Sequence, residues 1–175
     1  MIGIDFATKI ADVDETVLDH DHENPSDYVK RLAIEKCKSI NSLFDENYLI
    51  IAADTTVYLK NRIYGKPKNN EEAFIFLSKL SSQTHIVFTC VAIAHKRIIL
   101  SDIAKTSVTF LSLTKDDIYQ YIETNEHEDK AGGYGIQGYG SQFIKKINGC
   151  YFNVMGFPIS LFYNMLKNNL NNKEM

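Results

Sequence analysis

The sequence predicts an α/β fold in which helices flank a mixed central sheet. Two observations lead to this prediction. Apolar residues at helical spacing alternate along the chain with short apolar runs typical of strands, and this interleaving is typical of α/β proteins. One run, HIVFTCVAIA at 85–94, is almost entirely apolar, as expected of a central strand buried on both faces. No linker, repeat or low-complexity segment divides the sequence, which predicts a single domain over residues 1–175.

The first helix is predicted over residues 24–44. Asn24 can cap its start, and Pro25 suits the first turn because that position needs no backbone N–H. The apolar positions that share one face are Val29, Leu32, Ala33, Cys37 and Ile40. This face is expected to pack against the sheet.

The segment YLIIAA, at 48–53, indicates a short buried strand that ends at Asp54. Residues 56–64 then predict a hairpin that turns at Lys60 and Asn61.

Two further helices are predicted from their caps. In the helix at 69–80, Asn70 can cap the first turn, and in the helix at 114–125 Thr114 begins a partial capping box with Asp117. The helix at 69–80 has acidic residues, Glu71 and Glu72, in its first turn, where they suit the positive end of the helix dipole. The apolar positions of that helix are Ala73, Leu77 and Leu80.

The remaining elements complete the sheet and its cover. Residues 97–113 predict one long strand or two strands with a bend. Residues 142–154 predict a hairpin that turns at Asn148 and Gly149, and Pro158 is expected to open a last helix. The chain therefore alternates helices and strands along its whole length.

The composition excludes several classes of protein. The net charge is −3 and the pI is about 5.9, whereas binding duplex nucleic acid usually needs a basic face. No apolar run approaches the roughly 20 residues of a membrane helix, and the N-terminus lacks the pattern of a signal peptide. Three scattered cysteines give neither a disulfide framework nor a zinc site built on cysteine pairs. A reduced, cytoplasmic location is expected, without a nucleic-acid or membrane partner.

Acidic residues gather in the stretch ADVDET at 11–16. Alternating acids on an extended backbone point to opposite faces, so only some of Asp12, Asp14 and Glu15 are expected to converge. A solvated acidic loop explains the same pattern.

Asp54 follows four apolar residues, and a buried carboxylate is costly unless it is paired. Catalytic groups often stand where strands of α/β folds end. The alternative is that Asp54 caps a turn and faces water.

The stretch YGKPKNNEE at 64–72 offers a loop for an anion. Gly65 allows a ligand to approach the backbone, Pro67 stiffens the loop, and Lys66 lies between them. A helix begins soon afterwards, and helix N-termini attract anions. A plain turn with a solvated lysine is the alternative.

The most unusual stretch is DKAGGYGIQGYG at 129–140, which contains five glycines. Its backbone can lie close to a ligand. Lys130 supplies a positive charge, Gln137 supplies an amide that both donates and accepts hydrogen bonds, and Tyr134 and Tyr139 are candidates to stack on a base. A flexible glycine loop is the alternative.

Together these stretches supply acids for a divalent metal, lysines for phosphates and an amide for a base edge. That set suits phosphoryl chemistry on a nucleotide. Other candidates are weaker: His20 and His22 stand in an exposed acidic stretch, His85 precedes a buried strand and is expected to be structural, and the cysteines have no evident base partner.

Five motifs occur in an order and spacing that resemble the Maf family. They are AADTTV, GKP, LSSQTHIVFTCVAI, DKAGGYGIQGYG and INGCYFNVMGFP, and the likeness extends from about Ile4 to Leu166. The Maf family comprises septum-formation-inhibitor-like nucleotide pyrophosphatases with the inosine-triphosphatase-like fold. The resemblance implies a hydrolase that cleaves a nucleoside triphosphate between its α- and β-phosphates, with Mg or Mn as the divalent metal. A homodimer is a further expectation.

The resemblance also implies roles for individual residues. Asp54 matches the proton acceptor of the Ala-Asp-Thr motif, and Glu15 matches a glutamate expected to bind metal or water, so Glu15 and Asp54 are the expected metal ligands. The lysines expected to bind phosphates are Lys66 and Lys130. Thr55 and Gln137 match the branch that prefers dTTP and UTP, whereas the branch that prefers 7-methyl-GTP has acidic residues there. A carboxylate at a strand end would then be aimed at the attacking water.

One departure from the family concerns the start of the chain. The family begins with a strand, a Ser-x-Ser-Pro-Arg-Arg loop that binds phosphates, and a helix. Met1 to Phe6 resembles the segment after that helix, so on this resemblance the first βα unit is missing, either because the true start lies upstream or because the chain is shortened. Weak activity or none is expected from these residues. A non-catalytic nucleotide-binding regulator of cell division is therefore the alternative function.

Overall fold

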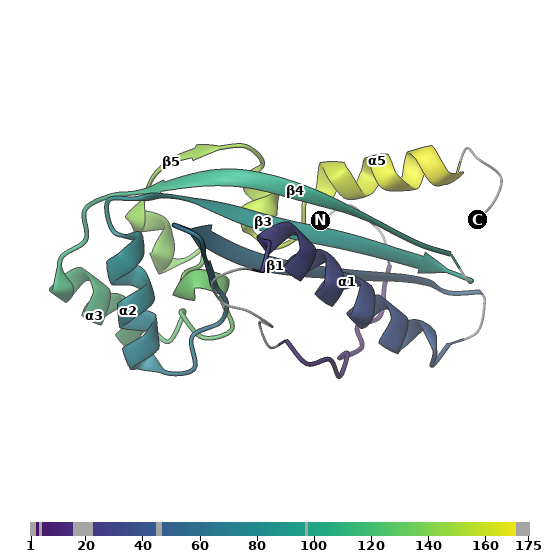
Figure 1. The fold of residues 1–175 in the computed structure, drawn as a ribbon, viewed down its shortest axis with the longest axis horizontal. Helices are drawn as coiled ribbons and strands as arrows, with labels where there is room; N and C mark the ends of the chain where they lie inside the picture. The colour runs from purple at the N-terminus through teal and green to yellow at the C-terminus, as the bar shows by residue number, and fades with distance from the viewer. Residues whose placement is uncertain (1–2, 4, 16–22, 45–46, 97, 171–175) are drawn as a thin grey trace.

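The computed structural model describes residues 3, 5–15, 23–44, 47–96 and 98–170. Within that part of the chain the strands form one sheet in the order β2-β1-β3-β4-β5 (Figure 1). The strands are β1 (Leu49–Leu59), β2 (Arg62–Tyr64), β3 (Thr84–His95), β4 (Ile98–Phe110) and β5 (Ile144–Asn148). The α/β class is confirmed, but all of these pairings are antiparallel, where the sequence predicted a mixed sheet.

A tight turn explains why β1 and β2 run in opposite directions. β1 and β2 are joined at Lys60 and Asn61, whose φ angles are 49° and 62°, and Leu59 pairs with Arg62. Two successive residues with positive φ suit the twist of a two-residue hairpin, so the predicted turn is confirmed. The predicted long strand is the single strand β4.

One face of the sheet is covered by helix α1 (Pro25–Asn41). The side chain of Asn24 caps this helix by accepting a hydrogen bond from the Ser26 N–H at 2.9 Å. The whole predicted apolar face of α1 is buried. It packs against the small side chains Cys90, Ala92 and Ala94 of β3, which let the helix lie close to the sheet.

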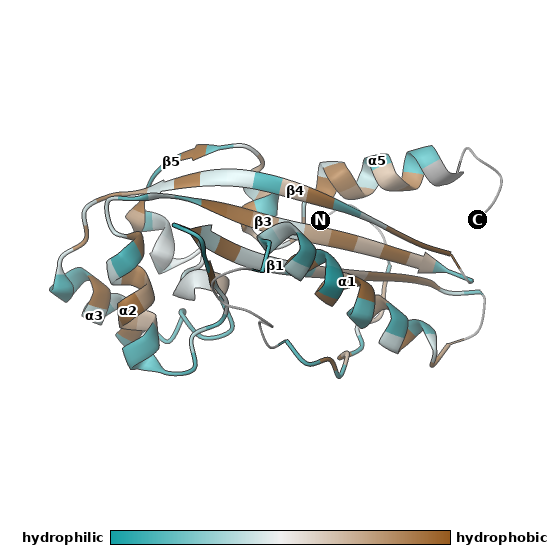
Figure 2. Cartoon of the chain, in the orientation of Figure 1, coloured by the Kyte–Doolittle hydropathy of each residue, from teal (hydrophilic) through white to brown (hydrophobic). Residues whose placement is uncertain are grey.

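The opposite face of β3 is covered by helix α5 (Ile159–Leu170). Val91 and Ile93 alternate with the residues that face α1 and pack against Phe162 and Met165. β3 is therefore buried on both faces, as its apolar run predicted, and Figure 2 shows it largely in the apolar colour.

A third part of the core lies at the end of the sheet where α2 (Asn70–Leu80) and α3 (Lys115–Glu123) pack. The capping box of α3 is present as predicted. The cap of α2 is Asn69 rather than the predicted Asn70, because Asn69 Oδ1 accepts the Glu72 N–H at 2.9 Å. Because Asn69 and Asn70 are adjacent and equally suited to capping, the sequence alone does not show which of them caps α2.

The predicted hairpin at Asn148 and Gly149 is wrong. β5 ends at Asn148, and the chain continues into the short helix α4 (Tyr151–Val154). The Cys150 N–H donates to Thr106 Oγ1 at 3.0 Å. This bond ties the chain to β4 just after Gly149, so no returning strand forms.

The predicted strand end at Asp54 is also wrong. Asp54 lies in the middle of β1 and pairs with Cys90 of β3. The β-branched residues that follow, Thr55 and Thr56, continue the strand, since such residues favour extended backbone. No helix in the described part of the chain is long and apolar enough to cross a membrane.

Candidate active site

Asp54 forms the centre of a charged cluster between β1 and α1. Its residue is only 8% exposed, and its Oδ1 accepts a hydrogen bond from Lys36 Nζ at 2.6 Å. Lys36 lies on α1, beside the apolar stripe that seats this helix on the sheet. Packing of α1 therefore places an ammonium group against the buried carboxylate.

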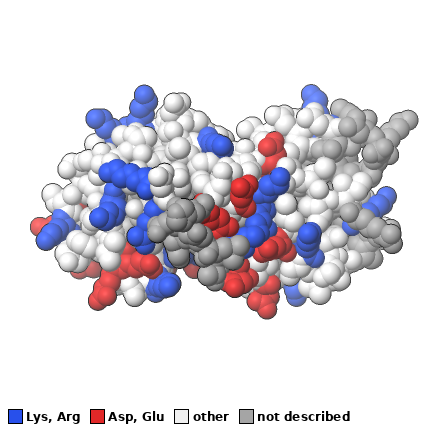
Figure 3. All heavy atoms as spheres, viewed as in Figure 1, with Lys and Arg blue, Asp and Glu red and all other residues white. Residues whose placement is uncertain are grey.

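Glu15 joins Asp54 to the Gly-Lys-Pro loop. Lys36 Nζ lies 2.6 Å from Glu15 Oε1, and Lys66 Nζ lies 2.8 Å from Glu15 Oε2. The hydroxyl of Tyr28, on α1, donates to the Glu15 backbone carbonyl at 2.9 Å. The structure thus brings together the predicted site residues Asp54, Glu15 and Lys66: Lys36 joins Asp54 to Glu15, and Glu15 contacts Lys66. Figure 3 shows acidic and basic atoms side by side on the face that α1 covers.

The charges of the cluster shift the pKa values of its members. Burial raises the pKa of Asp54, against the opposing pull of Lys36. Burial acts in the same direction on Glu15, but the two lysines outweigh it and hold the pKa of Glu15 below its usual range. Burial alone would lower the pKa of the Lys36 ammonium, whereas Asp54 and Glu15 raise it. The lysine stays charged, and Asp54 is a stronger base than an exposed aspartate.

The two phosphate-binding candidates lie on loops that are tied together. The Gly132 N–H donates to the Gly65 carbonyl at 2.9 Å, which joins the turn η1 (Ala131–Gly133) to the loop that carries Lys66. Lys130 precedes η1 and is exposed. Both lysines are therefore available to a ligand, and Lys66 is available in addition to its bond with Glu15.

The two tyrosines of the glycine loop differ in their surroundings. Tyr134 is 5% exposed, and its hydroxyl lies 2.7 Å from Nε2 of His85. It therefore anchors the loop and does not stack on a base, which corrects the prediction. His85 is structural, as predicted. Tyr139 is 66% exposed and stays a candidate for stacking.

The two residues expected to set base preference lie on different elements, Thr55 on β1 and Gln137 on the glycine loop. Thr55 faces the side of the sheet opposite Asp54, because successive residues of a strand alternate. Its Oγ1 lies 2.9 Å from Oγ1 of Thr89, and a Cβ on Gly156 would lie 3.5 Å from Thr55 Oγ1. Gln137 is exposed on the glycine loop.

Sequence reasoning missed Lys36. The signal was present, because a lysine one position before Cys37 stands at the edge of the apolar face of the predicted helix. Nothing in the sequence alone pairs this lysine with Asp54, which follows 18 positions later. The structure shows which acid of the stretch 11–16 joins the site. Glu15 enters the cluster, whereas Asp12 and Asp14 are exposed.

Two carboxylates that converge on one cation suit a divalent metal. Glu15 and Asp54 both contact the Lys36 ammonium, and Mg²⁺ usually takes one or two carboxylates, with substrate phosphates and waters completing its shell. The residues present therefore fit such an ion. Within the described residues no group of three His, Cys, Asp or Glu side chains gathers to hold a metal without a substrate.

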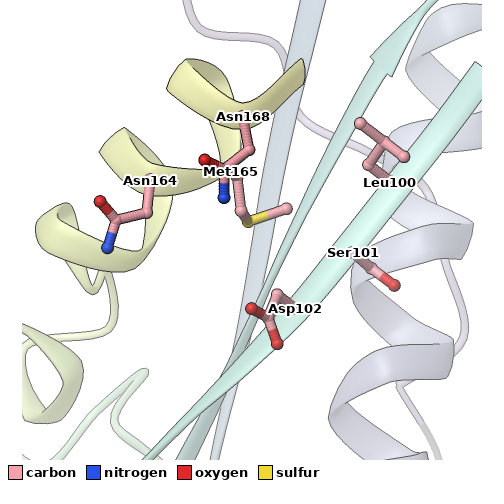
Figure 4. A pocket seen from close by; sticks show the side chains of 6 residues that line it. All are labelled: Leu100, Ser101, Asp102, Asn164, Met165 and Asn168. Atoms are coloured by element: carbon pink, nitrogen blue, oxygen red, sulfur yellow. The ribbon is translucent and has the colours of Figure 1, made fainter. Parts of the chain in front are cut away.

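Other candidates lie away from this cluster. A pocket of about 240 Å³ opens between β4 and α5, and Figure 4 shows that its lining contains none of the predicted site residues. Its lining residues are Leu100, Ser101, Asp102, Asn164, Met165 and Asn168. Burial raises the pKa values of Cys37 and Cys90 to about 11 and about 12, so neither is a thiolate at neutral pH. His20 and His22 lie outside the described residues.

Comparisons with known proteins agree with the motifs. Residues 1–169 match the family model described as Maf-like protein. A dTTP/UTP pyrophosphatase of Clostridium beijerinckii is 42% identical over 142 residues, covering 80% of this chain and 76% of the relative. The dTTP/UTP pyrophosphatases of Thermoanaerobacter sp. and Bacillus thuringiensis subsp. konkukian are 38% and 40% identical, each covering 95% of this chain and 86% of the relative. With its fold, its motifs and these relatives, the chain belongs to the Maf-like protein family.

Proposed function

We propose that this chain is a nucleoside triphosphate pyrophosphatase that hydrolyses dTTP and UTP to the monophosphate and pyrophosphate, and that residues 1–175 form one catalytic domain. The observation that carries the proposal is the buried carboxylate of Asp54, which burial makes more basic and which lies in one cluster with Glu15 and two lysines. The names of the curated relatives support the choice of dTTP and UTP.

The cluster suggests how the reaction proceeds. A water oxygen attacks the α-phosphorus, the bond from that phosphorus to the bridging oxygen of the β-phosphate breaks, and pyrophosphate leaves. Asp54 accepts the proton of the attacking water, which its raised pKa favours. Lys36 holds the Asp54 carboxylate in place at 2.6 Å. Lys66 and Lys130 bind the phosphate oxygens.

Glu15 and Asp54 would hold the divalent cation, Mg²⁺ or Mn²⁺. When bound, such an ion neutralises the charge that develops on the phosphate oxygens. Both carboxylates also contact the Lys36 ammonium, so a bound cation would share them with Lys36. Lys66 would bind phosphate oxygens beside its contact with Glu15.

The test is pyrophosphate release by the purified chain with Mg²⁺ or Mn²⁺, using dTTP, UTP, CTP, GTP and 7-methyl-GTP. Asp54→Asn should lower turnover by a factor of about 10² or more, the usual scale for loss of a general base, and should leave nucleotide binding in place. Asp116→Asn, an exposed acid on α3, is the matched control. Binding without turnover in the unaltered chain would instead favour a nucleotide-binding regulator of cell division.

Two further expectations accompany the proposal. We expect a cytoplasmic location and a homodimer. Sedimentation of the purified chain tests the second of these.

A further inference from the structure

The glycine loop bends around the carboxylate of Glu126, which follows α3. The Tyr139 N–H donates to Glu126 Oε2 at 2.6 Å, and the Gly140 N–H donates to Glu126 Oε1 at 3.1 Å. Both carboxylate oxygens are therefore used by the loop backbone. Hydrogen bonds from N–H groups to a charged acceptor are stronger than those between neutral groups.

Two glycines of the loop leave room for this carboxylate. A Cβ at Gly135 would lie 2.8 Å from Glu126 Oε1, and a Cβ at Gly138 would collide with Glu126 Oε2. Gly135 has no positive φ, whereas Gly138 has φ −109° and ψ −140°, outside the helical and extended regions that other residues favour. Space for Glu126 therefore favours glycine at both positions.

Further contacts hold the loop on the side that precedes Gln137. The Gly135 N–H donates to the hydroxyl of Tyr121 at 3.2 Å, and Ile136 is buried with 6% exposure. Burial, with a contribution from the charge of Glu126, raises the pKa of Tyr121, so its hydroxyl stays neutral. Gln137 itself is exposed. Its neighbours on both sides are thus fixed while its side chain points to solvent.

We propose that Glu126 is a positioning residue for Gln137 and thereby sets the recognition of the nucleotide base. The inference rests on the proposed function, in which Gln137 meets the base. A side-chain amide carries a donor and an acceptor, and it can distinguish thymine or uracil from cytosine only where its backbone is held at a fixed place. Glu126 supplies that fixed place through its bonds from the Tyr139 and Gly140 N–H groups.

The first experiment measures KM and kcat of Glu126→Gln with dTTP, UTP and CTP. This variant keeps the shape of the side chain, but its NH₂ group cannot accept the second N–H bond. We expect KM for dTTP to rise by about tenfold, equivalent to ~1.4 kcal/mol, with kcat within about twofold of the unaltered chain. Selectivity for dTTP over CTP should fall, and the Tyr139 and Gly140 amides should exchange hydrogen faster.

The second experiment separates this role from a general loss of structure. Gly138→Ala should raise KM in the unaltered chain, because its Cβ meets Glu126. In a Glu126→Ala background the same change should cost far less, since the colliding carboxylate is gone, and the two effects should be non-additive. Glu128→Gln, an exposed acid two positions away, is the control and should leave KM and selectivity unchanged.

Three results would overturn the inference. They are an unchanged KM and selectivity in Glu126→Gln, a loss of kcat alone, and an equal cost of Gly138→Ala in both backgrounds. An unaltered chain that hydrolyses none of the triphosphates would overturn the proposed function and, with it, the link to base recognition. The two failures differ, because only the second abolishes turnover before any substitution is made.

Discussion

Lys36 makes a carboxylate tolerable in the middle of a strand. A buried charge without a partner is costly, and the Lys36 ammonium lies 2.6 Å from both Asp54 and Glu15. The same contact opposes the effect of burial on the pKa of Asp54. At the scale of single residues, stability and basicity of the site therefore depend on one side chain.

Lys36→Met should affect both properties. Removing one partner of a buried pair costs about 3 to 5 kcal/mol, and we expect roughly 2 to 3 here because the Lys36 side chain is 18% exposed. The pKa of Asp54 should rise further without the cation, so the acid limb of the pH profile of kcat/KM should move to higher pH. Urea unfolding and a pH–rate profile measure the two effects.

Lys38→Met is the matched control, because Lys38 lies on the same helix and is exposed. A Lys36→Met protein with unaltered stability and an unaltered acid limb would contradict the role given to the contact.

His85 makes the stability of the molecule depend on pH. Burial lowers the pKa of His85 to about 4 from its ordinary value of 6.5, so the unfolded chain binds more protons between these two values. The free energy of unfolding should therefore fall as pH falls from about 6.5 to about 4, by up to roughly 3 kcal/mol. His85→Gln does not titrate and should lack this part of the slope. Equal slopes in urea unfolding from pH 7 to pH 4 would argue against the assignment.

At the scale of elements, the turn η1 fixes how the lysine loops meet. Gly132 has a φ of 71°, and a Cβ there would lie 2.8 Å from Val57 Cγ2. Gly132→Ala should lower the free energy of unfolding by about 1 to 3 kcal/mol through strain and overpacking. Thermal unfolding measures this.

Gly65 offers a contrast within the same pair of loops. A Cβ at Gly65 meets nothing within 4 Å, so Gly65→Ala should change the stability by less than about 0.5 kcal/mol. A rise in KM in this variant would indicate that substrate approaches the loop closely. A loss of stability equal to that of Gly132→Ala would contradict the difference between the two sites.

Local signals in the sequence predicted most elements, and long-range contacts account for the misses. The caps of α1 and α3, the hairpin at Lys60 and the buried β3 depend on neighbours in sequence, and all were predicted. The path after Gly149 depends on Thr106 in another strand, and the burial of Asp54 within β1 depends on its contact with Lys36. Neither contact can be predicted from hydrophobic periodicity or turn propensity.

The candidate site follows the same division. The motifs identified Glu15, Asp54 and Lys66 as candidates, and the structure brings these three together. The alternation of side chains that separates Asp54 from Thr55 also follows from strand geometry once the strand continues. Lys36 and Glu126 were missed because a lysine or glutamate at a helix or loop edge is ordinary until its partner is known.

At the scale of the whole molecule, a bound nucleotide should link the two halves of the site. One half consists of Lys36 on α1 and Asp54 on β1. The other half consists of Lys130 and Gln137, which belong to the glycine loop. A dTTP analogue with an uncleavable α–β bridge, at 100 times its Kd, should raise the free energy of unfolding by about 2.7 kcal/mol. For a chain of this size that corresponds to a rise in Tm of roughly 5 to 10 °C.

Asp54→Asn should retain this thermal shift, because it removes the base and leaves the lysines in place. Absence of any shift in the unaltered chain would contradict nucleotide binding.

Successive side chains of β1 point to opposite faces of the sheet, so even- and odd-numbered residues lie in different surroundings. Even-numbered Asp54 faces α1, and odd-numbered Thr55 faces the side of Gly156. Inserting one residue early in β1 would put Ala53 in the place of Asp54 against Lys36 and turn Asp54 to the opposite face of the sheet, whereas inserting two would return Asp54 to the face of α1. The proposed chemistry is therefore sensitive to single-residue insertions in β1, and lengthening should be tolerated more readily in the turn at Lys60 and Asn61.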